Sequence, residues 1–228
     1  MGVVLMDFDG TLAYRPGMWS QCMVEVLDEL SPGHGVEADD LRPHLRDGFP
    51  WHRPDQPHLH LGDPEAWWRH VGSLLAEAFL STGADPLDVP RAVAAARSHY
   101  CDPSRFQLFP DTLPALRLLK AAAWRTVVLS NHVPELPEIV RGVGISALID
   151  QVFTSASTGY EKPHPDMFRI GLGGTPPSDA WMVGDSLEAD VRGAEAIGVR
   201  AILVRRTDDS ARRQSATLTE AAETILAG

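Results

Sequence analysis

The sequence predicts an α/β fold with a mostly parallel sheet that helices cover on both faces. Three observations predict it. The short apolar run VVLM at residues 3–6 is typical of a buried strand. From residue 105 onward, such runs alternate with amphipathic segments, which is the pattern of βαβ crossovers. Between residues 15 and 100 the apolar residues instead recur at helical spacing, which predicts an all-helical insertion.

The insertion is predicted to contain helices over residues 19–30, 37–47, 64–80 and 88–100. Pro64 and Pro90 lie near the starts of the last two helices, and Asp63 and Asp88 precede them as candidate caps. The first strand belongs with the later strands. We therefore divide the chain into an α/β core of residues 1–14 and 101–228 and an inserted α-helical cap of residues 15–100.

The remaining elements of the core follow in alternation. Strands are expected over residues 125–130, 151–155, 180–185 and 200–206. Helices are expected over residues 111–124, 134–143, 165–172, 187–198 and 217–227.

Composition excludes several classes of protein. Of the 228 residues, 44% are hydrophobic and 22% are charged, which is typical of a globular chain. The formal net charge of −11 argues against nucleic acid as a partner, and no apolar run is long enough to span a bilayer. With only Cys22 and Cys101, a disulfide framework is not expected, and a cytoplasmic location is predicted.

Polar side chains follow the predicted core strands at the point where each strand ends. Asp7 and Asp9 follow the first strand, Ser130 and Asn131 close the second, and Asp185 ends the strand at 180–185. In an open parallel sheet the carboxyl ends of the strands share one edge, where ligands bind. These groups are therefore expected to converge on one site.

The residue types at this edge fit phosphoryl transfer. Asp7 and Asp185 could hold Mg²⁺, which prefers oxygen ligands and would relieve the repulsion between neighbouring carboxylates. Ser130, Asn131 and Lys162 can donate hydrogen bonds to phosphate oxygens. One carboxylate of the first pair can attack phosphorus, and the other can protonate the leaving oxygen.

Four motifs resemble those of the haloacid dehalogenase (HAD) superfamily in the same order along the chain. They are DFDGTL at 7–12, LSN at 129–131, the lysine of GYEKPHPDMF at 159–168 and GDSLEAD at 184–190. The resemblance implies a Rossmann-like core and places the chain in the subgroup with a helical cap inserted after the first motif.

The resemblance also implies a role for each acidic residue. Asp7 would be the nucleophile and Asp9 the general acid and base. Asp7, the main-chain carbonyl of Asp9 and Asp185 would bind Mg²⁺, with Asp190 as a candidate outer ligand.

The same resemblance implies that Ser130 and Lys162 bind the transferring phosphoryl group with main-chain amides near Gly10. Two positions depart from the usual pattern. Ala189 stands where the fourth motif often has Asn, which leaves the role of Asp190 open. His132 follows the second motif, where it could contact the leaving group or cap the next helix.

The stretch at 48–68 is rich in Pro, His and Trp. His52, His58 and His60 could suggest zinc, but their spacing matches no compact ligand pattern and no thiolate joins them. Shaping of a substrate pocket and plain packing within the cap both remain open for this stretch.

The leading hypothesis is a Mg²⁺-dependent phosphatase that hydrolyses a small phosphorylated metabolite through an aspartyl-phosphate intermediate. A phosphomutase of the β-phosphoglucomutase kind shares the acid/base residue and is the alternative. A 2-haloacid dehalogenase is disfavoured because Asp9 is present, and a non-catalytic binding protein would not need the complete motif set. The sequence does not determine the substrate or the oligomeric state.

Overall fold

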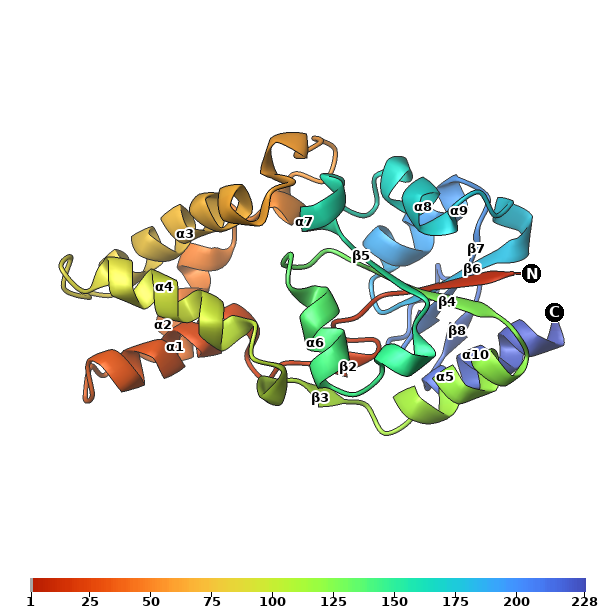
Figure 1. The fold of residues 1–228 in the computed structure, drawn as a ribbon, viewed down its shortest axis with the longest axis horizontal. Coiled ribbons are helices and arrows are strands. Elements are labelled where there is room, and N and C mark those ends of the chain that lie inside the picture. Colours follow the sequence, from red (N-terminus) through yellow and green to blue (C-terminus); the bar gives the residue numbers. More distant parts are fainter. Residues whose placement is uncertain (1) are drawn as a thin grey trace.

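The computed structural model describes residues 2–228 and is built around a six-stranded sheet of order β5-β4-β1-β6-β7-β8. All neighbouring strands in it are parallel (Figure 1). The strands are β1 (Val3–Met6), β4 (Arg125–Ser130), β5 (Gln151–Thr154), β6 (Ala180–Gly184), β7 (Arg200–Val204) and β8 (Gln214–Ser215). The predicted α/β fold with a parallel sheet is confirmed.

Helices cover both faces of this sheet, as predicted. They are α5 (Thr112–Ala121), α6 (Leu136–Gly142), α7 (Ser155–Thr158), α8 (Pro165–Leu172), α9 (Gly193–Ala196) and α10 (Leu218–Ala227). Side chains alternate along β1: Val3 and Leu5 pack in the apolar cluster under α8 and α9, whereas Val4 and Met6 pack in the cluster under α5 and α10. Burial on both faces explains why the strand reads as a continuous apolar run.

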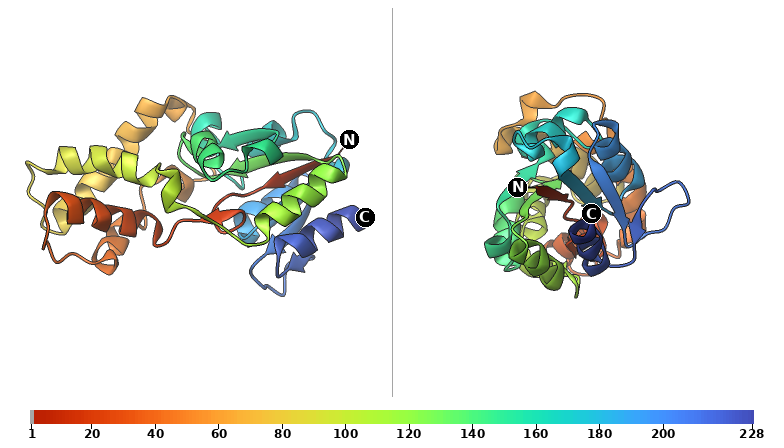
Figure 2. Two further views of the ribbon diagram at one scale, coloured as in Figure 1. Left: turned by 60° about the horizontal axis from the view of Figure 1, so that its bottom comes forward. Right: turned by 90° about the vertical axis from the view of Figure 1, so that its right-hand side faces the viewer.

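Four helices between β1 and α5 lie beyond the carboxyl ends of the sheet strands, at the end of the molecule opposite to both chain termini (Figures 1 and 2). They are α1 (Met18–Leu30), α2 (Ala38–Leu41), α3 (Pro64–Ser81) and α4 (Val89–Tyr100). A two-stranded antiparallel ribbon, which the sequence did not predict, joins β2 (Ala13–Tyr14) to β3 (Gln107–Leu108) where the chain leaves and re-enters the core.

Two local expectations within this helical region are wrong. The predicted helix over 37–47 is the short α2 followed by a 3₁₀ turn at Arg42–Leu45, because Pro43 has no N–H to donate to an α-helical bond. Asp63 caps α3 by accepting from the Ala66 N–H at 3.1 Å, as predicted. Asp88 makes no side-chain cap bond, since its backbone is already helical rather than extended.

The predicted helix over 187–198 is present but starts with a wide π-helical turn, Leu187–Arg192, before α9. The N–H groups of Asp190 and Val191 both donate to the Ser186 carbonyl, at 3.0 and 3.2 Å. The Asp190 carboxylate in turn accepts from the Ser186 N–H at 3.0 Å. This turn directs a fully buried Asp190 back toward the end of β6.

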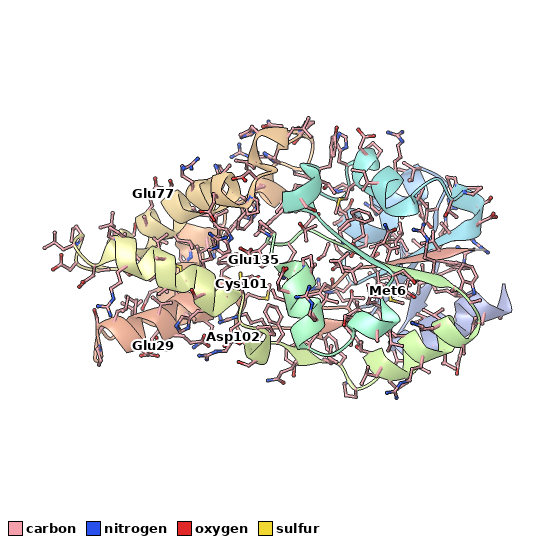
Figure 3. The ribbon with its side chains drawn as sticks, viewed as in Figure 1. Met6, Glu29, Glu77, Cys101, Asp102 and Glu135 are labelled. Atoms are coloured by element: carbon pink, nitrogen blue, oxygen red, sulfur yellow. The ribbon has the colours of Figure 1, made fainter. Side chains whose placement is uncertain are left out.

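A polar contact joins the helical region to the core at Glu135, which Figure 3 labels beside α6. Glu135, just before α6, accepts from the indole N–H of Trp68 on α3 at 2.9 and 3.0 Å. It also pairs with Arg97 on α4 at 2.9 Å. We call this contact the Glu135 clasp.

None of the helices within residues 2–228 has the length and apolar character needed to cross a membrane. Cys22 and Cys101 are both free thiols.

Candidate active site

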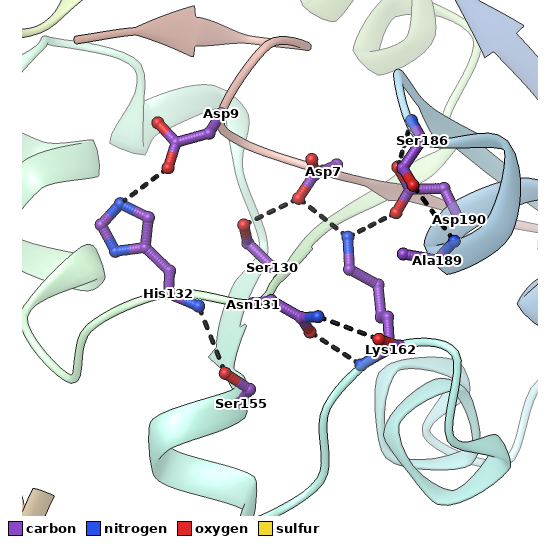
Figure 4. Close-up of polar contacts among 10 residues, drawn as sticks. All are labelled: Asp7, Asp9, Ser130, Asn131, His132, Ser155, Lys162, Ser186, Ala189 and Asp190. Carbon is purple, nitrogen blue, oxygen red and sulfur yellow. Dashed lines mark hydrogen bonds and ion pairs between the residues drawn. The ribbon is translucent and has the colours of Figure 1, made fainter. Parts of the chain in front are cut away.

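The first aspartate of the opening motif lies at the centre of the sheet edge. Asp7 directly follows β1, and its N–H donates to the Val183 carbonyl of β6 at 3.0 Å. The ends of the neighbouring strands bring Ser130 and Asp185 beside it. The Ser130 hydroxyl donates to Asp7 Oδ1 at 2.7 Å (Figure 4). The convergence that parallel strand ends predict is therefore present.

Lys162 supplies the positive charge at this edge. Its Nζ lies 2.8 Å from Asp7 Oδ1 and 2.5 Å from Asp190 Oδ1, with all three side chains buried (Figure 4). Burial alone would lower the pKa of Lys162, but the two carboxylates outweigh it and raise the pKa. The ammonium group is therefore held charged beside the carboxylate that the sequence singles out as the nucleophile.

Asn131 holds Lys162 in place through the main chain. The Asn131 amide donates to the Lys162 carbonyl at 2.9 Å and accepts from the Lys162 N–H at 2.7 Å. Both ends of the amide are thus occupied by one peptide segment. The structure shows a positioning contact for Asn131, and its expected contact with phosphate stays a prediction.

Asp9 and His132 form a close pair at the other side of the site. Asp9 Oδ2 lies 3.3 Å from His132 Nε2. Burial, reinforced by the charges of Asp7 and Asp185, raises the pKa of Asp9 to about 8. Burial lowers the pKa of His132 to about 4, which suits its position among the rings of Phe8, Tyr100 and Phe106. Both shifts favour the uncharged forms of the two side chains, a neutral imidazole and a protonated carboxyl group.

Three carboxylates at this edge could share a cation. Asp7, Asp185 and Asp190 each offer an oxygen within 4.8 Å of the others. Gly10, at φ 74°, makes the space for Asp185, because a Cβ there would lie 2.5 Å from Asp185 Oδ2. Arg206 lies 2.9 Å from the same carboxylate, yet its side chain is 68% exposed. A cluster of oxygen donors of this kind fits a hard divalent cation such as Mg²⁺.

A cavity of about 470 Å³ opens above these residues. Its floor includes Asp9, Asn131, His132 and Lys162 from the core. The facing wall comes from the helical region, namely Met18, Trp19, Trp51, Pro54 and Tyr100. Each predicted catalytic residue therefore lies at or beside one cavity.

Sequence reasoning missed most of this facing wall. Trp51 and Pro54 belong to the Pro-, His- and Trp-rich stretch at 48–68, whose composition was the only available signal. The three histidines of that stretch belong to no cluster of metal-ligating side chains within residues 2–228. His58 instead contacts the Pro50 carbonyl at 3.1 Å.

Comparison with known proteins identifies the protein family to which this chain belongs. The family model for haloacid dehalogenase-like hydrolases matches residues 1–198. The chain belongs to this family of hydrolases, as its motifs predict.

Two curated relatives are phosphatases by name. The chain is 35% identical over 133 residues to a phosphoserine phosphatase of Thermus thermophilus, covering 57% of this chain and 52% of that protein. It is 33% identical over 147 residues to a glyceraldehyde 3-phosphate phosphatase of Methanopyrus kandleri, covering 60% and 59%. The matched segments thus span little more than half the length of these relatives.

Among solved structures, a 2-haloacid dehalogenase of Pseudomonas syringae pv. Tomato DC3000 superimposes with a TM-score of 0.72. It is 23% identical, and the superposition covers 100% of this chain and 98% of that one. This likeness shows the fold, so the reaction has to be argued from the site.

Proposed function

We propose that the protein is a Mg²⁺-dependent phosphatase that hydrolyses a small phosphorylated metabolite through an aspartyl-phosphate intermediate. The observation that carries this proposal is the pair of Asp7 and Asp9. Asp7 is held beside a buried ammonium group, and Asp9, two residues further on, has a pKa that burial and the charges of Asp7 and Asp185 raise to about 8. A phosphate ester needs both a nucleophile and a proton for its leaving oxygen, whereas a halide leaves without a proton.

In the first half-reaction the Asp7 carboxylate attacks phosphorus and forms an acyl phosphate. The bond between phosphorus and the ester oxygen breaks, and Asp9 gives its proton to that oxygen. Lys162 and Ser130, which lie 2.8 and 2.7 Å from Asp7, donate to the negative charge on the transferring group. In the second half-reaction the Asp9 carboxylate takes a proton from water, which attacks phosphorus and releases Asp7.

Asp7, the main-chain carbonyl of Asp9 and Asp185 would hold the Mg²⁺ ion, with Asp190 as an outer ligand. When bound, the ion neutralises charge on the phosphoryl oxygens. The cluster of three carboxylates supports this assignment.

We further propose that residues 15–100 act as a cap over a catalytic core of residues 1–14 and 101–228. The cavity supports this division, because its floor comes from the second set of residues and its facing wall from the first. Closure of such a cap would exclude bulk water from the acyl phosphate, and reopening would release the product. The cytoplasm is the proposed location.

The test is release of inorganic phosphate from a panel of phosphomonoesters by the full chain, with Mg²⁺ and again after chelation. Release should require Mg²⁺ and should fall to the level of the blank in Asp7→Asn. Asp28→Asn, which alters an exposed acid on α1, is the matched control and should keep full activity. Turnover of 2-haloacids, or interconversion of sugar phosphates without release of phosphate, would replace this proposal with the corresponding alternative.

A further inference from the structure

The wall that faces the catalytic residues is apolar. Met18, Trp19, Trp51, Pro54 and Tyr100 form it. Trp19 stacks on Tyr100 with ring centroids 3.7 Å apart, and Trp51 stacks on Phe49 at 4.4 Å. Stacked rings lose little freedom on contact with a ligand, so the wall is preorganised.

An unusual backbone conformation places one member of this wall. Gly17 and Met18 are consecutive residues in the left-handed region, with φ of 68° and 48°. Gly17 adopts this conformation without strain, whereas Met18 does not. The turn starts α1 and leaves the Met18 side chain 36% exposed at the cavity. A strained backbone at a cavity lining points to a role for that side chain in the site.

The cations near the cavity are already committed. Arg15 is 2% exposed, pairs with Glu25 at 2.7 Å and donates to the Met18 carbonyl at 3.0 Å. Arg53, next to Pro54, pairs with Asp47 at 2.7 Å.

Two further arginines line a different hollow. Arg42 and Arg46 border a neighbouring pocket that shares only Met18 and Trp19 with the cavity. Within residues 2–228, Lys162 is the one cation that lines the cavity, and it is paired with Asp7 and Asp190. The two carboxyl groups that line the cavity are those of Asp9 and Glu188. No side chain in the described lining offers an unpaired positive charge to a second anionic group on the substrate.

We infer that the leaving group of the substrate is an uncharged, apolar alcohol, and that Met18 and Trp51 select it; this inference rests on the proposed phosphatase function. The phosphoryl group would occupy the core side, where Lys162 and Ser130 lie. The carbon skeleton would lie against the aromatic wall. A cavity of about 470 Å³ has room for a phosphoryl group and a ring.

An apolar leaving group implies that esters carrying a second charged group are poor substrates for this protein. A carboxylate, as in phosphoserine, or a second phosphate would have to leave water for a surface without a free cation. Such a group is rejected strongly because its charge would be desolvated without a partner. An apolar ring in the same place gains free energy from its burial.

The experiment compares two primary alkyl esters whose leaving alcohols have similar acidity, 3-phenylpropyl phosphate and 4-(phosphonooxy)butanoate. Initial rates of phosphate release by the full chain with Mg²⁺ give kcat/KM for each. We expect the phenyl ester to be favoured at least about tenfold. Equal values, or a preference for the carboxylate, would overturn the inference while leaving the phosphatase function supported. Release from neither ester, nor from para-nitrophenyl phosphate, would overturn both.

Variants of the wall provide the second part of the test. Met18→Arg should reduce the preference for the phenyl ester by raising kcat/KM for the carboxylate ester. Leu59→Arg adds the same charge at a 63% exposed cap residue outside the cavity lining and should leave the ratio unchanged. Trp51→Ala, which removes apolar surface instead of adding charge, should lower kcat/KM for the phenyl ester more than for the carboxylate ester. A ratio that is the same in all four proteins would contradict the assignment of the wall.

Discussion

The two walls of the cavity differ in how their side chains are held. On the side formed by the core, the core wall, Lys162 lines the cavity and is held together with Asp7, Ser130 and Asp190 by hydrogen bonds and ion pairs of 2.5 to 2.8 Å. On the cap wall, aromatic rings are fixed by stacking. Hydrogen bonds are directional and can position a reacting atom. The free energy of apolar contacts depends instead on the area buried and on how well the surfaces fit. The difference supports the proposal that the core wall performs the chemistry and the facing wall selects the substrate.

Among changes to the core wall, Asp9→Asn should have the largest effect on the rate of phosphate release. The variant cannot give a proton to the leaving oxygen, so kcat should fall about 10² to 10⁴-fold. The preference between the phenyl and carboxylate esters should persist in the residual activity, because the cap wall is unchanged. A variant with normal kcat and a changed preference would show that Asp9 contacts the leaving group without transferring a proton.

Lys162→Met should cost stability as well as activity. It leaves Asp7 and Asp190 buried without their cation, a change that typically costs about 3–5 kcal/mol. Urea unfolding followed by tryptophan fluorescence measures this loss. The double variant Lys162→Met with Asp190→Asn also removes the unpaired carboxylate of Asp190. It should therefore recover part of the stability but none of the activity. Recovery of both would mean that Lys162 has a structural role only.

Glu161→Gln should have the smallest effect, and only on stability. Unlike Asp190, the buried Glu161 has no ion pair within residues 2–228. Burial raises its pKa from 4.5 to about 7, so the folded protein binds a proton that the unfolded chain releases. The native chain should therefore lose stability relative to the variant as pH rises from 4.5 to 7, by at most about 3 kcal/mol.

Unfolding curves of both proteins at pH 4, 6 and 8 measure this difference. The two should be equally stable at the lowest pH, and the variant should be the more stable at the highest. A constant difference across the range would show that Glu161 does not titrate between these values.

Part of the core wall could be predicted from the sequence because some of its residues lie at the ends of neighbouring strands of the sheet. Parallel strands align their carboxyl ends, so Asp7, Ser130 and Asp185 had to meet once the strands were recognised. The contact of Asn131 with the Lys162 main chain could not be predicted in this way. It depends on the path of the loop between α7 and α8, for which the sequence contains no periodic signal.

The cap wall could not be predicted because its members come from separate segments with no shared pattern. Met18, Trp51 and Tyr100 lie far apart in the chain and meet only through the packing of the helical region. The left-handed backbone conformation of Met18 could not be predicted either, because methionine has no preference for that conformation. The composition of the 48–68 stretch left a contribution to the substrate pocket open but did not show which of its residues reach the cavity.

The Glu135 clasp holds a tryptophan whose fluorescence would change if the helical region moved away from the core. Any rotation that separates α3 and α4 from α6 must break the contacts of Glu135 with Trp68 and Arg97. The indole of Trp68 would then exchange a carboxylate neighbour for water, a change to which its emission is sensitive. Trp68 would therefore be an intrinsic optical reporter of the proposed opening, and it lies outside the lining of the cavity.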